Sequence, residues 1–341
     1  MIWRMVAMAA AGLVAFAASG HDAAVDPRAD IAFASRRDGN WEIYVMDAAG
    51  RHQRRLTRRS TEDRFPLWSP DGRQIAFSSL AGSGAEDSWE LWLMNADGTR
   101  QRRLASHIIA KSTRGWSPDG THIALTAVAA NNVDIYKVDV QSGRATRLTS
   151  GSGEDRDPSW SPDGTALTFS SNRDGTPQVY VMDASGRNQR QLTSEAVGAL
   201  APRWSPDGSR IAFTSGPDGN RDLYLTGTKA GTVRRVTKGA HLTRDPASWS
   251  PDGSRIAVQI ADLKDYNVGI VRLGNEPRAP LLIASSPAYD GSFTWSPDGK
   301  QLAFISDRDG FDAVYVAGVD AARAVRLTES ASLTPAWGWQ R

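Results

Sequence analysis

Charged residues that could do chemistry occur in short groups, each a few residues ahead of a tryptophan. Carboxylate oxygens gathered in this way could bind a divalent cation, and carboxylates beside guanidinium groups could form a docking ring for a protein segment. The plainer alternative is a set of solvated loops with local Asp–Arg pairs, each contributing little free energy. The candidate partner-binding residues are Asp63, Arg64, Asp155, Arg156, Asp245 and Asp290.

Other kinds of chemistry find little support in the sequence. The chain has no cysteine, which excludes thiolate metal sites, cysteine nucleophiles and the lipid-anchored class of lipoprotein. Neither a short-spaced metal-ligand pattern nor a glycine-rich phosphate loop is present. We therefore predict no catalytic residues, no metal ligands and no cofactor, although a divalent cation bound by the carboxylates above stays open as an alternative.

The balance of charge also limits the class of partner. Lys+Arg number 40 and Asp+Glu 38, which leaves a net charge of +2 in 341 residues. A chain adapted to nucleic acid or to acidic lipid carries a much larger basic excess. We expect no nucleic-acid partner, and the 40% of hydrophobic residues is ample for a packed core.

A repeated motif organises the elements that must position these charges. Trp-Ser-Pro-Asp-Gly occurs six times at intervals of 44 to 48 residues, and Pro335-Ala336-Trp337 matches Pro66-Leu67-Trp68, which leads into the first copy. Repeats of about 45 residues with four short strands are typical of β-propellers, in which neighbouring sheets cover both faces of each blade. The repeat tryptophans are predicted to pack between blades, with ligand stacking as the alternative. They are Trp68, Trp116, Trp160, Trp204, Trp249, Trp295 and Trp337.

The runs between the motifs have the composition of strands. They are four to six residues long, rich in β-branched and aromatic types, and separated by Asp-Gly or similar turns. In Ser-Pro-Asp-Gly, proline presets the second turn position and glycine accepts the left-handed conformation that closes the hairpin. The fourth run of a repeat carries an arginine, which we expect on an outer edge strand, where charge opposes aggregation. These arginines are Arg55, Arg103, Arg147, Arg235 and Arg326.

The two ends of the chain carry complementary parts of one repeat. Ile31 to Thr57 holds the second, third and fourth runs, whereas Pro335-Ala336-Trp337 holds only the tryptophan run. We predict that the C-terminal strand becomes the innermost strand of the first blade and closes the ring. The expected fold is therefore an all-β, seven-bladed β-propeller of four-stranded antiparallel blades, with six blades as the alternative.

Strand alternation decides which loops share a rim of this ring. The tryptophan turns and the turns between third and fourth strands lie on one rim, which we call the turn rim. The segments that lead into the tryptophan strands and the loops between second and third strands lie on the other, which we call the loop rim. The candidate aspartates and arginines all fall on the loop rim, and we expect them to converge on the channel mouth.

The N-terminal residues are typical of an export signal. Residues 1–20 contain Arg4, an apolar run too short to span a membrane, and small residues at its end. An uncleaved anchor is the alternative. We expect a signal peptide at 1–20, a short segment at 21–30, and a single propeller domain at 31–341 without a membrane span, monomeric and periplasmic or secreted.

The repeat as it stands from Trp160 to Thr193 resembles the TolB-like propeller family of bacterial periplasmic proteins. The resemblance covers about residues 31–341 and implies a WD-like propeller that meets envelope partners. The resemblance implies a generally six-bladed propeller that follows a separate α/β domain; we expect no such domain here, because only about ten residues lie between the expected signal peptide and the first run. Peptidases with similar propellers carry a Gly-x-Ser-x-Gly motif, which is absent here.

Two functions follow from these observations. The first is an exported, non-catalytic scaffold that binds an envelope protein or peptide through the channel-mouth loops. The alternative is a carbohydrate-active propeller enzyme of the polysaccharide lyase or glycosidase type, because oligogalacturonate lyases share a similar repeat. Fold alone does not separate the two, since function depends on the site.

Overall fold

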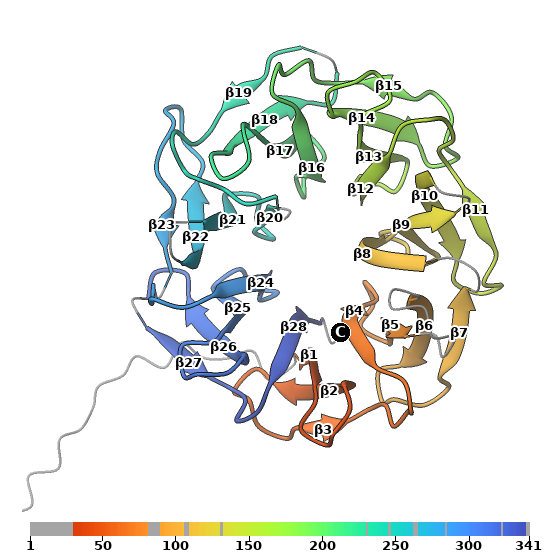
Figure 1. Cartoon of the computed structure of the whole chain (residues 1–341), viewed down its shortest axis with the longest axis vertical. Helices are drawn as coiled ribbons and strands as arrows, with labels where there is room; N and C mark the ends of the chain where they lie inside the picture. Colours follow the sequence, from red (N-terminus) through yellow and green to blue (C-terminus); the bar gives the residue numbers. More distant parts are fainter. Residues whose placement is uncertain are drawn as a thin grey trace, which may run out of the picture.

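Seven four-stranded antiparallel sheets surround a common axis and form a closed ring (Figure 1). The computed structural model describes residues 30–80, 89–105, 109–129, 132–229, 231–244, 247–261, 265–283, 285–321 and 323–338, with backbone alone at 109–114 and 129. The expected signal peptide at 1–20 and Asp245 lie outside the described residues. No helix that could cross a membrane is found in the part of the chain that is described.

Each blade places its strands in the same order from the axis outward. The innermost strands are β28 (Ser332–Trp337), β4 (Asp63–Trp68), β8 (Ile109–Trp116), β12 (Asp155–Trp160), β16 (Ala199–Trp204), β20 (Ser248–Trp249) and β24 (Asp290–Trp295). The second strands are β1 (Asp30–Ser35), β5 (Gln74–Leu80), β9 (His122–Ala129), β13 (Ala166–Ser171), β17 (Arg210–Ser215), β21 (Arg255–Ala261) and β25 (Gln301–Ser306).

The strands become shorter toward the outer edge of each blade. The third strands are β2 (Glu42–Asp47), β6 (Trp89–Asn95), β10 (Asn132–Asp139), β14 (Gln178–Asp183), β18 (Asp222–Gly227), β22 (Tyr266–Arg272) and β26 (Ala313–Gly318). The fourth strands are β3 (Arg54–Arg55), β7 (Arg102–Ala105), β11 (Ala145–Arg147), β15 (Arg190–Gln191), β19 (Arg234–Arg235), β23 (Leu281–Leu282) and β27 (Ala324–Arg326).

The C-terminal strand closes the ring as the sequence predicts. Strand β28 pairs antiparallel with β1, placing Trp337 opposite Ile31, and the Gly338 N–H donates to the Asp30 carbonyl at 2.9 Å. The first blade therefore has the order β28-β1-β2-β3, with its innermost strand taken from the far end of the chain. Seven blades are confirmed, and the six-bladed alternative is wrong.

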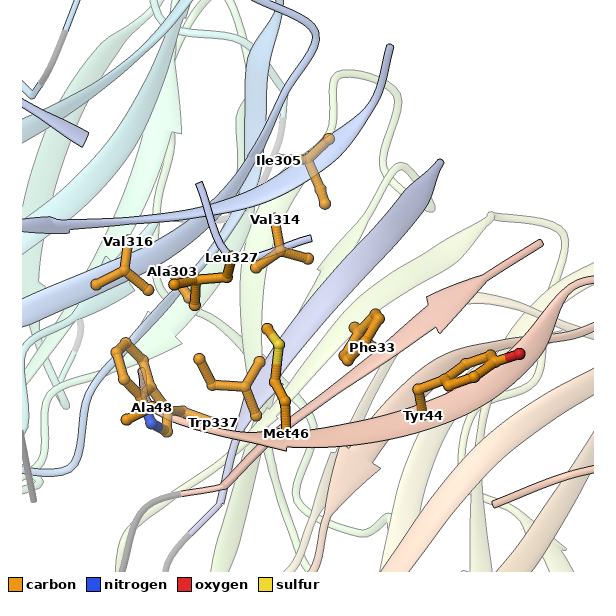
Figure 2. Close-up of a cluster of buried hydrophobic side chains, with 11 residues drawn as sticks. Phe33, Tyr44, Met46, Ala48, Ala303, Ile305, Val314, Val316, Leu327 and Trp337 are labelled. Carbon is orange, nitrogen blue, oxygen red and sulfur yellow. The ribbon is translucent and has the colours of Figure 1, made fainter. Parts of the chain in front are cut away.

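The core lies between blades. Figure 2 shows one of these layers, where Trp337 and Met46 of the first blade meet Ala303 and Val316 of the last. Burial of these side chains on both faces of each sheet is the main stabilising contribution, because a single sheet would leave one apolar face in water. Closure by β28 therefore completes both a hydrogen-bonded sheet and an apolar layer.

The Ser-Pro-Asp-Gly turn is a small hydrogen-bonded unit. In the second blade the Ser69 hydroxyl donates to the Asp71 carboxylate at 2.6 Å and accepts from the Gln74 N–H at 2.9 Å. Gly72 has φ of +68°, as the hairpin requires. The six glycines of the motif have φ between +68° and +71°, which confirms the predicted turn chemistry.

The tryptophan that precedes each turn connects neighbouring blades. Four indole N–H groups donate to a main-chain carbonyl of the preceding blade, at 3.0 to 3.3 Å. Trp160, for example, donates to Gly115 at 3.1 Å. The acceptor is each time the residue immediately before the preceding tryptophan, so the motif contributes to the joint between blades as well as to the turn.

Candidate functional site

The aspartate that begins an innermost strand belongs to a repeated network on the loop rim. Asp155 lies opposite Ser171 in the β12–β13 register. Arg173, two residues beyond that serine, places Nη2 at 2.9 Å from both carboxylate oxygens of Asp155, and its Nε donates to the serine hydroxyl at 2.8 Å. The same guanidinium stacks over Phe169 and Tyr180. Hydrogen bonds between a guanidinium group and a carboxylate are charge-assisted and therefore stronger than those between neutral groups.

The last blade repeats this network. Arg308 Nη2 lies 2.9 and 3.1 Å from the two carboxylate oxygens of Asp290, and its Nε donates to Ser306 at 2.8 Å. Burial raises the pKa of Asp290, and the hydrogen bonds from Ser306 and Arg308 oppose that increase. Asp155 and Asp290 are thus each held by an arginine of their own blade.

The structure therefore corrects one expectation about the candidate residues. Asp63, Asp155 and Asp290 expose no more than 2% of their surface, so these carboxylates do not form an open charged ring at a channel mouth. Asp155 and Asp290 are covered by Arg173 and Arg308, which follow the second strands of their blades. Arg64 and Arg156 do reach solvent, with Glu62 and Glu154 at 2.7 and 3.0 Å respectively.

Asp63 is the exception to the repeated network. It lies opposite Ser79, as Asp155 lies opposite Ser171, but the residue two places beyond Ser79 is Ala81 instead of arginine. Among the described residues neither of its carboxylate oxygens accepts a hydrogen bond of full geometry, although the Ser79 and Thr57 hydroxyls act to lower its pKa, and the Arg59 Nε lies 3.6 Å from Oδ1. Burial raises the pKa of Asp63 to about 6.

The first blade has the arginine of this network but lacks the aspartate. Arg37 occupies the position of Arg173, but β28 supplies Ser332 where the other network supplies an aspartate. The Arg37 Nε donates to Ser35 at 3.2 Å, and its guanidinium stacks over Tyr44. Its Nη2 is buried without a partner among the described residues. The second blade thus has the aspartate without the arginine, and the first blade has the arginine without the aspartate.

A second group on the loop rim is built from aromatic rings. We call Trp41, Arg64, Phe65 and Trp89 the rim cluster. The Arg64 guanidinium carbon lies 4.8 Å from the centroid of the Trp41 ring and 5.7 Å from that of Trp89. Phe65 meets Trp89 edge to face at 5.8 Å. Sequence reasoning missed this cluster, although these two tryptophans stand outside the repeated motif and were visible as such.

The rim cluster adjoins a cavity at the inner edges of three blades. This cavity has a volume of about 210 Å³ and is lined by residues of β24, β28 and β4, with Phe65 and Phe293 among them. Phe65, Ser292 and Thr334 each have φ near +50° at a bulge of the innermost strand. Bulges of this kind redirect side chains, and here they bring residues from three strands around one space.

The structure gives the fourth-strand arginines a role that the sequence did not show. They lie on outermost strands as predicted, and several pair with an acid at the start of the third strand. Arg55 Nη2 lies 2.7 Å from Glu42, which also accepts a hydrogen bond from Thr57. Arg147 pairs with Asp134 at 2.6 Å. The Arg-Leu-Thr runs at Arg55 and Arg147 thus join the outermost strand of a blade to its third strand.

The metal alternative has no counterpart in the described residues. No group of three or more His, Cys, Asp or Glu side chains in that part of the chain could hold a metal ion. The aspartates that suggested such a site bind arginine in two blades, and Asp245 is outside the description. The loop rim instead presents partly exposed guanidinium groups that are bound by carboxylates or stacked on aromatic rings.

Comparison with known proteins agrees with the repeat. The chain matches the family described as the TolB beta propeller domain over residues 85–199 and 181–339, which together are more than half of its length. A segment of 56 residues is 39% identical to the Tol-Pal system protein TolB of Desulfosudis oleivorans and covers 16% of this chain. That segment is only 13% of the relative's own length.

Solved structures share the ring. The chain is similar to TolB from Acinetobacter baumannii with a TM-score of 0.57 and 20% identity, covering 92% of this chain and 67% of that one. It is also similar to an oligogalacturonate lyase from Vibrio parahaemolyticus, with a TM-score of 0.67, 17% identity, and coverage of 85% and 86%. These likenesses concern the fold alone. By its repeats, its blades and its match over most of the propeller, the chain belongs to the TolB beta propeller domain family.

Proposed function

We propose that the protein is an exported, non-catalytic scaffold that binds a protein or peptide partner of the bacterial cell envelope through its loop rim. The observation that carries this proposal is the rim cluster, in which the Arg64 guanidinium lies against two tryptophan rings. Arginine and tryptophan dominate the binding energy of protein interfaces, because they offer large contact areas and several hydrogen bonds. Membership of the TolB propeller family supports an envelope partner and a periplasmic or secreted location.

The predicted site residues take two roles in this proposal. Arg64 and Arg156 make contact with the partner, since about a quarter and a third of their side chains are exposed. Asp155 and Asp290 are each bound by an arginine of their own blade and fix the starts of their innermost strands, whereas Asp63 has no such arginine. Asp245 stays a predicted member of the same rim. Preorganised side chains of this kind bind with a smaller entropy cost than free ones.

Charge reversal at the rim cluster tests the proposal. Arg64→Glu is expected to lower capture of an envelope partner by at least about tenfold, because it removes a stacked cation and places a carboxylate beside Glu62. The measurement compares the amount of the main envelope-extract protein retained on immobilised wild-type and variant chains. Arg187→Glu is the matched control, since Arg187 is an exposed arginine on the turn rim. Equal retention by all three chains would contradict docking at the rim cluster.

The carbohydrate-active alternative has its own test. Purified protein is incubated with acidic and neutral polysaccharides, with and without a chelator, and release of reducing or unsaturated ends is measured. The scaffold proposal expects no turnover under either condition. Turnover that the chelator abolishes would replace the scaffold by a metal-dependent enzyme, and the loss of activity in rim variants would then locate its site.

A further inference from the structure

A second cavity opens at the opposite end of the ring axis, on the turn rim. It has a volume of about 350 Å³ and lies where β12, β16 and β20 end. Its walls include three of the repeat tryptophans, Arg203 and Ser248, and none of its nine lining residues is acidic. The tryptophans are Trp160, Trp204 and Trp249.

Arg203 breaks the pattern of the repeat. The residue immediately before the repeat tryptophan is small or apolar in the other six blades, and only this blade carries a charge there. The six residues are Leu67, Gly115, Ser159, Ser248, Thr294 and Ala336. A residue that the fold of every blade required would be repeated in every blade. We therefore infer that Arg203 has a role other than folding.

The Arg203 guanidinium also has no salt bridge among the described residues, although the negative charge of Asp157 acts on it. Its Nη1 donates to the main-chain carbonyls of Pro202 at 2.8 Å and Asp157 at 3.4 Å. Within the described part of the chain no carboxylate lies within ion-pair distance of it, whereas Arg173 and Arg308 each hold an aspartate. Burial lowers the pKa of the Arg203 guanidinium, and the negative charge of Asp157 opposes this. Arginine stays ionised even so, and a partly buried cation without a salt bridge favours an anion beside it.

The walls determine the kind of anion. The planar guanidinium fork matches a carboxylate, and indole faces accept a ring or an apolar chain. A cavity of this size suits a small ligand rather than a folded partner. We propose that this cavity binds an organic carboxylate, with the acid group on Arg203 and the apolar body of the ligand against the three tryptophans. The site is separate from the rim cluster, which lies at the other end of the axis.

Calorimetry with a charged ligand and its uncharged counterpart tests this site. Phenylacetate is expected to bind the full-length protein at pH 7, and phenylacetamide is expected to bind at least about tenfold more weakly, because a charge-assisted hydrogen bond is lost. Arg203→Gln should weaken phenylacetate binding by about 10- to 100-fold, whereas Arg187→Gln should leave it unchanged. Arg203→Lys, which keeps the charge without the fork, is expected to be intermediate.

Two peptide ligands separate the sources of the carboxylate. An acetylated peptide ending in phenylalanine is compared with the same peptide as its C-terminal amide. Binding of the acid form assigns the site to chain ends as well, and binding of phenylacetate alone assigns it to small free acids. Equal binding of phenylacetate and phenylacetamide, absence of binding, or full affinity in a folded Arg203→Gln chain would overturn the proposal. If that variant does not fold, the two ligand pairs and Arg203→Lys still decide.

The outcome is independent of the docking proposal. Arg203→Gln should retain the envelope partner as well as the wild-type chain does, and Arg64→Glu should bind phenylacetate normally. Each variant therefore reports on one end of the ring, and failure of one proposal leaves the other testable.

Discussion

Asp63→Asn is expected to raise the free energy of unfolding at pH 8 by up to about 3 kcal/mol and to change it little near pH 4. Burial raises the pKa of Asp63 to about 6. In the unfolded chain the same carboxyl titrates near its ordinary value of about 4. The folded protein therefore binds the proton more tightly, and the wild-type protein loses stability as the pH rises from about 4 to about 6.

The local structure explains why this carboxylate is costly. It is fully buried, its blade lacks the arginine that binds Asp155 and Asp290, and Arg59 approaches it only to 3.6 Å. The negative charge of Glu42 raises its pKa further. An amide is neutral at every pH, so the substitution removes the charge that burial penalises.

Asp155→Asn is the matched control, because Asp155 holds the same position in another blade. Its removal leaves the Arg173 guanidinium without its carboxylate partner, and we expect a loss of about 2 kcal/mol at pH 8. The two substitutions should therefore have opposite signs. Denaturant unfolding of both variants at pH 8 and pH 5 measures this, and a destabilised Asp63→Asn chain with the wild-type pH slope would refute the explanation.

Trp160→Ala is expected to lower the free energy of unfolding by about 3–5 kcal/mol. Its indole packs against residues of two blades and donates a hydrogen bond to the Gly115 carbonyl at 3.1 Å. The substitution removes these contacts, leaves a cavity between blades and leaves that carbonyl without its donor. The residues in this layer are Ala124, Ile135, Leu148, Leu167, Phe169, Tyr180 and Met182.

Calorimetry should show the melting temperature of Trp160→Ala lowered by about 5–10 °C. Trp160→Phe separates the two causes, since it keeps most of the apolar volume and loses the N–H donor. A smaller decrease in that variant, of about 1–2 kcal/mol, is expected from the unpaired carbonyl and the reduced ring. An unchanged melting temperature in Trp160→Ala would show that the indole does not join the blades.

Repetition explains why the fold could be predicted from the sequence. The turn chemistry is local, so Ser69, Asp71 and Gly72 specify it without help from the rest of the chain. Closure could be predicted because the chain ends carry complementary parts of one repeat, and Trp337 indeed pairs opposite Ile31. Both inferences needed only spacing and strand order.

The candidate site was harder to predict, because its geometry depends on register. Arg173 is 18 residues after Asp155, and only the pairing of Asp155 with Ser171 brings the guanidinium onto the carboxylate. Asp63 lacks a hydrogen-bonded arginine partner because its blade has no counterpart of Arg173. This is visible only when the blades are compared with one another. The rim cluster joins Trp41 of one blade to Arg64 of the next, a contact that local sequence cannot show.

The C-terminal strand that completes the first blade also affects how the protein folds during synthesis. Residues 30–35 leave the ribosome long before their partner strand, residues 332–337. Until then β1 has an uncovered hydrogen-bonding edge that could pair with another chain. Protection of that edge by a chaperone during translation would therefore matter more for this protein than for a propeller whose blades are each continuous in sequence.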